Sequence, residues 1–202
     1  MVWAAVADAF ALVIGTLVLT AVALALVPRV RDTEGAPAPV AEGQTSVTPE
    51  RLARLELLEQ ALAGNIRAGE ISVLDGRIGI LANVLFELNQ AKLTGEGEAI
   101  VASLAPPLQR YLATCDDSVM VSGYTDDLAI HAGPFHDNWR LSLERALTVM
   151  RSLVRAGVPE GRVFAAGFGE HRPVVPNRDD ESRAMNRRVE IVPIPKSRGT
   201  FP

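Results

Sequence analysis

The chain has 202 residues, a formal net charge of −4 and a sequence pI near 5.4. This acidic balance argues against nucleic-acid binding, which needs a basic face. The single cysteine, Cys115, rules out a disulfide framework or a CxxC metal site, and no cysteine near the N-terminus offers a lipoprotein anchor. Three histidines without HExxH spacing argue against zinc. The sequence holds no nucleophile–base pair and no phosphate loop, so we expect neither an enzyme nor a bound cofactor.

The first 28 residues predict a single transmembrane anchor. Residues 9–27 are mostly Ala, Val, Leu and Ile and contain no charged side chain. Nineteen helical residues span ~29 Å, about the thickness of the hydrocarbon core of a bilayer. Trp3 is placed for one membrane interface, and Pro28 with Arg29 for the other.

Two questions about this segment stay open: whether it is a cleaved signal peptide, and in which orientation it spans the membrane. The segment Ala23–Ala25 resembles a signal-peptide cleavage site, although Asp8 stands where a basic leader is expected. Arg29 and Arg31 follow the span, so the positive-inside rule alone would keep the C-terminal side in the cytoplasm. A start codon placed too late, which would remove a basic tail, also explains that conflict. The domain downstream instead favours the opposite orientation, with the C-terminal side outside the cytoplasm.

Asp8 is the unusual residue of this segment. A carboxylate inside a bilayer costs about 3 kcal/mol or more, so intramembrane acids are candidates for function. On a helix Asp8 shares a stripe with Leu12, Gly15 and Leu19 and can face a partner helix. The alternative is that Asp8, only ~8 Å beyond Trp3, reaches water at the interface.

Residues 29–69 are predicted as a linker followed by a short helix. Residues 29–50 mix Pro, Gly, Ala, Ser and charged residues without apolar periodicity, and extended they reach at most ~75 Å. Thr48 then opens a helical stretch that we expect Gly64 to end. Its apolar stripe has spacings of three and four: Leu52, Leu55, Leu58 and Leu62.

Residues 70–195 are predicted as one compact domain, followed by a tail at 196–202. Asp75-Gly76 between two alternating apolar segments predicts a β-hairpin. Helices are expected over 96–112, where Pro106-Pro107 should cause a kink, and over 138–156, capped by Asn138. Three further strands are expected at 118–122, 162–166 and 188–193, the last two joined by a long polar loop. The order β–β–α–β–α–β predicts an α/β (α+β) sandwich, a mixed sheet with helices packed on one face.

Three polar clusters are the candidate chemistry of this domain. They are the stretches 123–127, 138–146 and 184–190. If the three meet, Asp126 lies near Arg145 and Arg187 and near amide side chains. Such a site suits a zwitterion, because Asp126 takes an ammonium group while an arginine grips a carboxylate by paired hydrogen bonds. The alternative is that Asp126 and Arg145 form only a salt bridge within the domain.

Together these clusters resemble the OmpA-like (OmpA/MotB C-terminal) peptidoglycan-binding domain. The resemblance covers residues 70–194 and rests on VLFELNQAKL, GYTDD, NWRLSLERA, GFGEHRPVVPN and AMNRRVEI in this order. It implies a ligand, the diaminopimelate stem peptide of peptidoglycan, whose side-chain terminus is a zwitterion. By motif, it makes Asp126 and Arg145 the principal ligands. Asn89, Thr125, Asn138 and Arg187 would support them. Tyr124 replaces the His of many members.

The sequence is similar, more narrowly, to MotB-type stator subunits. The 19-residue gap from Asp126 to Arg145 and the order Trp3…Ala7-Asp8 carry this likeness, whereas Ala129 replaces the usual proline. It implies that Asp8 conducts protons or sodium in a homodimer with a MotA-like multispan protein. It also implies a place in the inner membrane, with the C-terminal domain in the periplasm. The chain lacks the usual basic cytoplasmic tail and is short for a flagellar stator, so a Zorya-type defence motor and a plain membrane-to-wall tether stay open.

Overall fold

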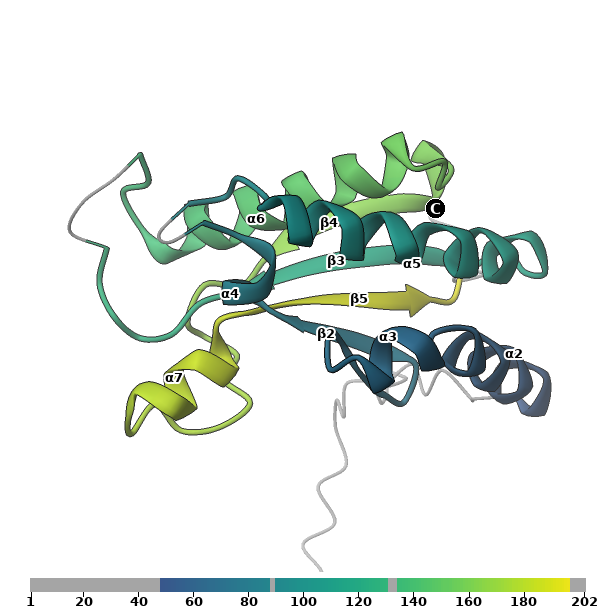
Figure 1. Ribbon diagram of the computed structural model, residues 1–202, viewed down its shortest axis with the longest axis horizontal. Coiled ribbons are helices and arrows are strands. Elements are labelled where there is room, and N and C mark those ends of the chain that lie inside the picture. The colour runs from purple at the N-terminus through teal and green to yellow at the C-terminus, as the bar shows by residue number, and fades with distance from the viewer. Residues whose placement is uncertain (1–47, 88–89, 131–133, 197–202) are drawn as a thin grey trace, which may run out of the picture. The chain divides into compact units, whose positions relative to one another are not determined.

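The computed structural model describes residues 48–87, 90–130 and 134–196 (Figure 1). The predicted membrane span, Asp8, most of the predicted linker and Asn89 therefore lie outside the described residues, as does the tail beyond residue 196. Within the described ranges, no helix combines the length and hydropathy of a membrane span.

A five-stranded mixed sheet is the centre of the domain. Its strands lie in the order β1-β2-β5-β3-β4. The strands are β1 (Ser72–Leu74), β2 (Arg77–Leu81), β3 (Ser118–Tyr124), β4 (Val163–Gly167) and β5 (Arg188–Ile194). β3 and β4 pair in parallel, and all other neighbours are antiparallel. The C-terminal strand thus lies inside the sheet, between β2 and β3, and joins the hairpin to the parallel pair.

The longer helices cover one face of this sheet (Figure 1). The helices are α2 (Pro49–Ala61), α3 (Ala63–Arg67), α4 (Ala82–Leu85), α5 (Gly95–Ala113), α6 (Asn138–Arg155) and α7 (Asp180–Asn186), with a 3₁₀ turn at Glu160–Arg162. α6 packs on β3 and β4, and α5 packs between α6 and α2. α7 lies apart from these three helices (Figure 1). The predicted mixed α/β architecture is thereby confirmed for the described domain.

The register of the strands separates an apolar face from a polar one. Ile78, Ile191 and Val121 stand side by side on β2, β5 and β3, all fully buried under the helices. Because side chains alternate along a strand, Arg188 and Glu190 of β5 point to the opposite face. There Glu190 accepts hydrogen bonds from Arg188 and Arg77. The sheet therefore carries its core on one face and a buried ion network on the other.

The hairpin and the amphipathic helix α6 form as predicted. Asp75 and Gly76 both have positive φ, 52° and 74°, as a two-residue type I′ turn requires. Pro106 and Pro107 both lie inside α5, which continues past them to Ala113.

The first helical region differs from its prediction at its end. Gly64 does not stop the helix: α2 ends at Ala61, and α3 continues the helical path as far as Arg67. The residue that ends the region is Gly69, whose φ of +74° is the left-handed conformation that glycine adopts at little cost.

Two further predictions are corrected in the second half of the chain. The N-cap of α6 is Asp137, whose carboxylate accepts the Arg140 N–H at 2.6 Å, and Asn138 is the first helical residue. The long polar loop between β4 and β5 contains α7, which is held by a capping box between Asp179 and Ser182. Seven residues are too few to show an apolar period, so only the capping pattern could have predicted α7.

Candidate functional site

The sheet topology brings the first and third polar clusters together. β3 and β5 are antiparallel neighbours, and Tyr124 at the end of β3 pairs with Arg188 at the start of β5. Asp126, just beyond β3, therefore meets Arg187, just before β5. Arg187 Nη1 donates to Asp126 Oδ2 at 2.6 Å.

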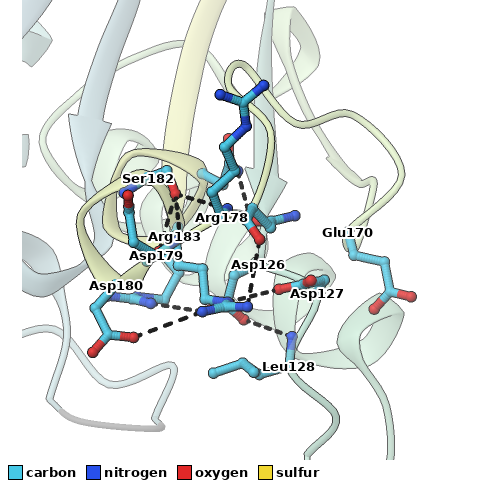
Figure 2. A network of polar contacts seen from close by, with 12 residues as sticks. Asp126, Asp127, Leu128, Glu170, Arg178, Asp179, Asp180, Ser182 and Arg183 are labelled. Atoms are coloured by element: carbon cyan, nitrogen blue, oxygen red, sulfur yellow. Dashed lines mark hydrogen bonds and ion pairs between the residues drawn. The ribbon is translucent and has the colours of Figure 1, made fainter.

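Hydrogen bonds to both carboxylate oxygens hold Asp126 in one orientation. Its side chain is buried, and Oδ1 accepts the backbone N–H of Leu128 at 3.2 Å (Figure 2). Arg187 remains about a third exposed, so the ion pair contributes only about 1 kcal/mol to folding. A carboxylate has about four lone-pair directions, and these two bonds leave room for further donors. Asp126 is thus a fixed acceptor at the edge of solvent.

Arg145 enters the same region from α6 and is 6% exposed. Its Nε donates to the backbone oxygen of Gln90 at 2.9 Å, and its guanidinium lies over the ring of Phe86. Burial lowers the pKa of Arg145 to about 10, with the nearby charge of Arg187 acting in the same direction and that of Asp126 opposing it. Arg145 stays cationic at neutral pH, and its surroundings favour the arrival of an anion.

The salt bridge between Asp126 and Arg145 that the sequence left open is not formed. Asp126 pairs with Arg187 instead, and Arg145 has no ion-pair partner among the residues that the structure describes. The site therefore contains one paired and one unpaired guanidinium around a single carboxylate, within the described ranges.

Asn138 fixes the turn that carries Asp126. Its side-chain amide donates to the backbone oxygens of Asp126 and Leu128, at 3.4 and 3.0 Å, and to Glu170 Oε2 at 2.5 Å. The two N–H groups of this amide are shared among three acceptors from two loops, which ties the turn after β3 and the loop after β4 to the start of α6.

Thr125 contributes a hydroxyl group with unused hydrogen-bonding capacity. The residue is 3% exposed, and its backbone N–H donates to Gly169 O at 2.9 Å. Its Oγ1 is buried and makes no hydrogen bond with any of the described residues. Buried polar atoms are nearly always paired, so this hydroxyl beside Asp126 has capacity for a further hydrogen bond.

Close approach of α6 to the sheet sets the position of these groups, and two glycines that sequence reasoning missed permit it. A Cβ at Gly123 would lie 2.8 Å from the carbonyl carbon of Ser142, and one at Gly167 would lie 2.7 Å from Leu143 N. The Ser142 hydroxyl in turn accepts the Gly169 N–H at 3.0 Å. Both glycines stand at strand ends inside the quoted motifs, where a close backbone approach is a typical reason for glycine.

A rim of charged residues surrounds the site on the side of α7 (Figure 2). Arg183 donates to Asp127 at 2.9 Å and lies 3.8 Å from Asp180. The hydrogen bond with Asp127 is the main cause that raises the pKa of Arg183. Sequence reasoning missed this pair, because the two residues are 56 positions apart and α7 was expected to be a loop.

Five of the predicted site residues thus lie in one cluster: Thr125, Asp126, Asn138, Arg145 and Arg187. Asn89 and Asp8 are outside the described residues, and the role of each stays a prediction. Among the described residues, no three His, Cys, Asp or Glu side chains are placed to hold a metal ion. The cluster thus brings together a carboxylate, two guanidinium groups, an amide and a hydroxyl.

Comparison with known proteins gives relatives from several bacterial envelopes. Motility protein B of Bacillus subtilis is 39% identical over 80 residues, 39% of this chain and 31% of that protein. A MotB-like protein of Desulfovibrio vulgaris has a structure with a TM-score of 0.65 and 29% identity over 74% of this chain and 94% of that one. The structure of the cell wall anchor of the type VI secretion system of Pseudomonas aeruginosa has a TM-score of 0.61 and 30% identity. The match covers 69% of this chain and 97% of that one.

The region of resemblance coincides with the cluster. The chain spans about a third of the length of the curated relatives that it matches first. The sequence profile of the OmpA family matches residues 85–187, which run from α4 to the arginine that binds Asp126. This stretch is half of the chain and contains all five clustered residues. The chain belongs to the OmpA family, with a domain of the OmpA/MotB C-terminal type.

Proposed function

We propose that this protein binds peptidoglycan non-covalently, by holding the zwitterionic end of a diaminopimelate stem peptide at Asp126, Arg145 and Arg187. The observation that supports this most is the buried guanidinium of Arg145, close to a second guanidinium and a fixed carboxylate. A buried cation beside another cation is costly unless an anion joins it. A ligand that brings both a carboxylate and an ammonium group suits this set of charges.

The ligand groups have distinct places in this proposal. The carboxylate lies against Arg145 and Arg187, whose planar forks match it in two-pronged hydrogen bonds. The ammonium group donates to Asp126, whose oxygens have lone pairs beyond those used by Arg187 and Leu128. The Thr125 hydroxyl supplies a further hydrogen bond from beside the carboxylate. Asn138 keeps the turn in place, and we add Asn89 as a further ligand on the basis of the family motif alone. No chemical step is involved, so the protein acts as a binding protein rather than an enzyme.

The wider role we propose is that of a MotB-like stator subunit in an ion-driven motor, flagellar or Zorya-like. Support comes from the apolar stretch 9–27, the order Trp3…Ala7-Asp8, and the likeness to Motility protein B. In this role a homodimer sits in the cytoplasmic membrane with its C-terminal domains in the periplasm. Asp8 then carries the ion through a channel made with a MotA-like multispan protein.

A plain structural tether between membrane and cell wall is the second candidate. The similarity to the cell wall anchor of a type VI secretion system favours it. Replacing Asp8→Asn separates the two roles in the native host. Loss of the motor-dependent phenotype with unchanged wall binding supports the stator, with Asp8→Glu as the conservative control. An unchanged phenotype in the Asn variant supports the tether.

Co-sedimentation of the full-length protein with purified peptidoglycan sacculi tests wall binding. Replacing Asp126→Ala together with Arg145→Ala removes both ends of the clamp and should abolish sedimentation. The matched control is Arg110→Ala with Asp116→Ala, an exposed pair near the opposite end of β3 that leaves the same net charge. Sedimentation of the clamp variant at the level of this control would contradict the site.

A further inference from the structure

Beside the clamp, two aromatic rings form an exposed pair that the clamp does not use. The rings of Trp139 and His171 are 4.8 Å apart between centroids, with 30° between their planes. Trp139 is 52% exposed, although tryptophan is the side chain with the most apolar area to bury, and His171 is also exposed. This ordered, exposed pair offers a flat apolar surface on which a ligand ring can pack.

The pair is ordered before any ligand arrives. Trp139 lies in the first turn of α6, which Asp137 caps. The loop that carries His171 is held against the same turn, because the Gly169 N–H donates to Ser142 Oγ. The two backbones also approach closely: a Cβ at Gly169 would lie 3.4 Å from the backbone nitrogen of Trp139. A ligand on the pair therefore loses little affinity to ordering of the protein.

The aromatic pair is continuous with the clamp. Each ring follows a residue of the network around Asp126: Trp139 follows Asn138, and His171 follows Glu170. The Asn138 amide joins Glu170 Oε2 at 2.5 Å and also the backbone oxygen of Asp126. Figure 2 shows Glu170 on the side of the Asp126–Leu128 turn away from Asp180 of α7. Glu170 and Asn138, the chain neighbours of the two rings, therefore link the pair to the turn that carries Asp126.

We propose that Trp139 and His171 hold a sugar ring of the glycan strand, an inference that rests on the proposed peptidoglycan site. The stem peptide joins the glycan to diaminopimelate through only two residues, so the sugar that carries it lies a short peptide away from the clamp. A pyranose ring presents a face of C–H groups that packs on an aromatic ring, while its hydroxyl and acetamido groups need polar partners. The half-buried Glu170 carboxylate between the rings and the clamp supplies an acceptor for them.

Titration calorimetry of the full-length protein in detergent, with two ligands, tests this inference. One ligand is the free tripeptide L-Ala–γ-D-Glu–meso-diaminopimelate, and the other is the same tripeptide on its disaccharide. The wild type should bind the disaccharide form about tenfold more tightly, as for one aromatic contact of moderate strength. Trp139→Ala should remove this advantage and leave the affinity for the free tripeptide within about twofold. The control is Phe164→Ala, a 42% exposed aromatic of β4 that should keep both affinities.

The possible results separate this inference from the proposed function. Equal wild-type affinities for the two ligands would overturn the sugar contact and leave the clamp intact. A Trp139→Ala variant that loses both affinities equally would also overturn it, because the ring would then only support the clamp. If the wild type binds neither ligand, the proposed function itself fails, and the inference fails with it.

Discussion

Gly123→Ala is the substitution for which the structure makes the sharpest prediction. Gly123 lies in β3 directly beneath α6, and an added Cβ would lie 2.8 Å from the carbonyl carbon of Ser142 and closer still to its oxygen. Carbon atoms in contact prefer about 3.5–4.0 Å. The helix must therefore retreat by about 1 Å, because both partners are backbone and neither can rotate away.

The expected cost follows from two opposing effects. Overpacking of a well-filled core costs about 1–3 kcal/mol, and a backbone clash belongs at the upper end of that range. Replacing glycine in a strand returns about 0.5–1 kcal/mol of conformational entropy. The free energy of unfolding should thus fall by about 2 kcal/mol, which lowers the Tm by roughly 4–8 °C in a chain of this size. Arg145 lies one turn beyond Ser142 on α6, so ligand affinity should fall as well.

Thermal unfolding followed by circular dichroism measures this effect. The control is Gly161→Ala, where an added Cβ meets nothing within 4 Å, and it should change the free energy of unfolding by less than about 0.5 kcal/mol. A Gly123→Ala variant that melts with the Gly161→Ala control would refute the close approach of α6 to β3 and the position of the site that depends on it.

Two further substitutions test the buried polar contacts. Burial would raise the pKa of Glu190, but hydrogen bonds from Arg188 and Arg77 outweigh it and hold the pKa below its usual value of 4.5. This stabilisation is present above pH 4.5 and is lost as the pH falls through the lowered pKa. Glu190→Gln should lower the free energy of unfolding by about 3–5 kcal/mol at pH 7. Chemical denaturation at pH 7 and pH 3 should show this difference from wild type becoming smaller in acid. A difference that does not depend on pH would contradict the network. Tyr111→Phe removes the hydroxyl that donates to Asp117 at 2.5 Å and should cost about 1.5–3 kcal/mol in urea unfolding, where an unchanged midpoint would argue against that bond.

The sequence predicted the elements whose signals are local. The Asp75-Gly76 turn needs two residues with positive φ, and this dipeptide is well suited to it. α6 repeats its apolar residues over 18 positions, long enough for the period to be seen. α7 has only seven residues and was expected to be a loop. The cap of α6 was misplaced by one position because Asp137 and Asn138 are both good cap residues.

Contacts between distant segments were harder to predict. The polar motifs predicted that Asp126, Arg145 and Arg187 lie at one site. Which arginine pairs with Asp126 depends on the antiparallel register of β3 and β5. That register places Arg187 directly beyond the end of β3 and leaves Arg145 buried nearby. Sequence alone gives the residue types of such a cluster, and the strand order decides the pairing. Gly123 was missed for the same reason, since its role depends on a helix that follows 15 residues later.

Recognition of a zwitterion is the central claim, and one titration tests it directly. The full-length protein is titrated with the tripeptide that ends in meso-diaminopimelate and with its L-lysine analogue. The analogue keeps the side-chain ammonium but lacks the carboxylate beside it. Loss of charge-assisted hydrogen bonds to Arg145 and Arg187 should weaken binding of the lysine peptide about 10–100-fold. Equal affinities for the two peptides would contradict the clamp.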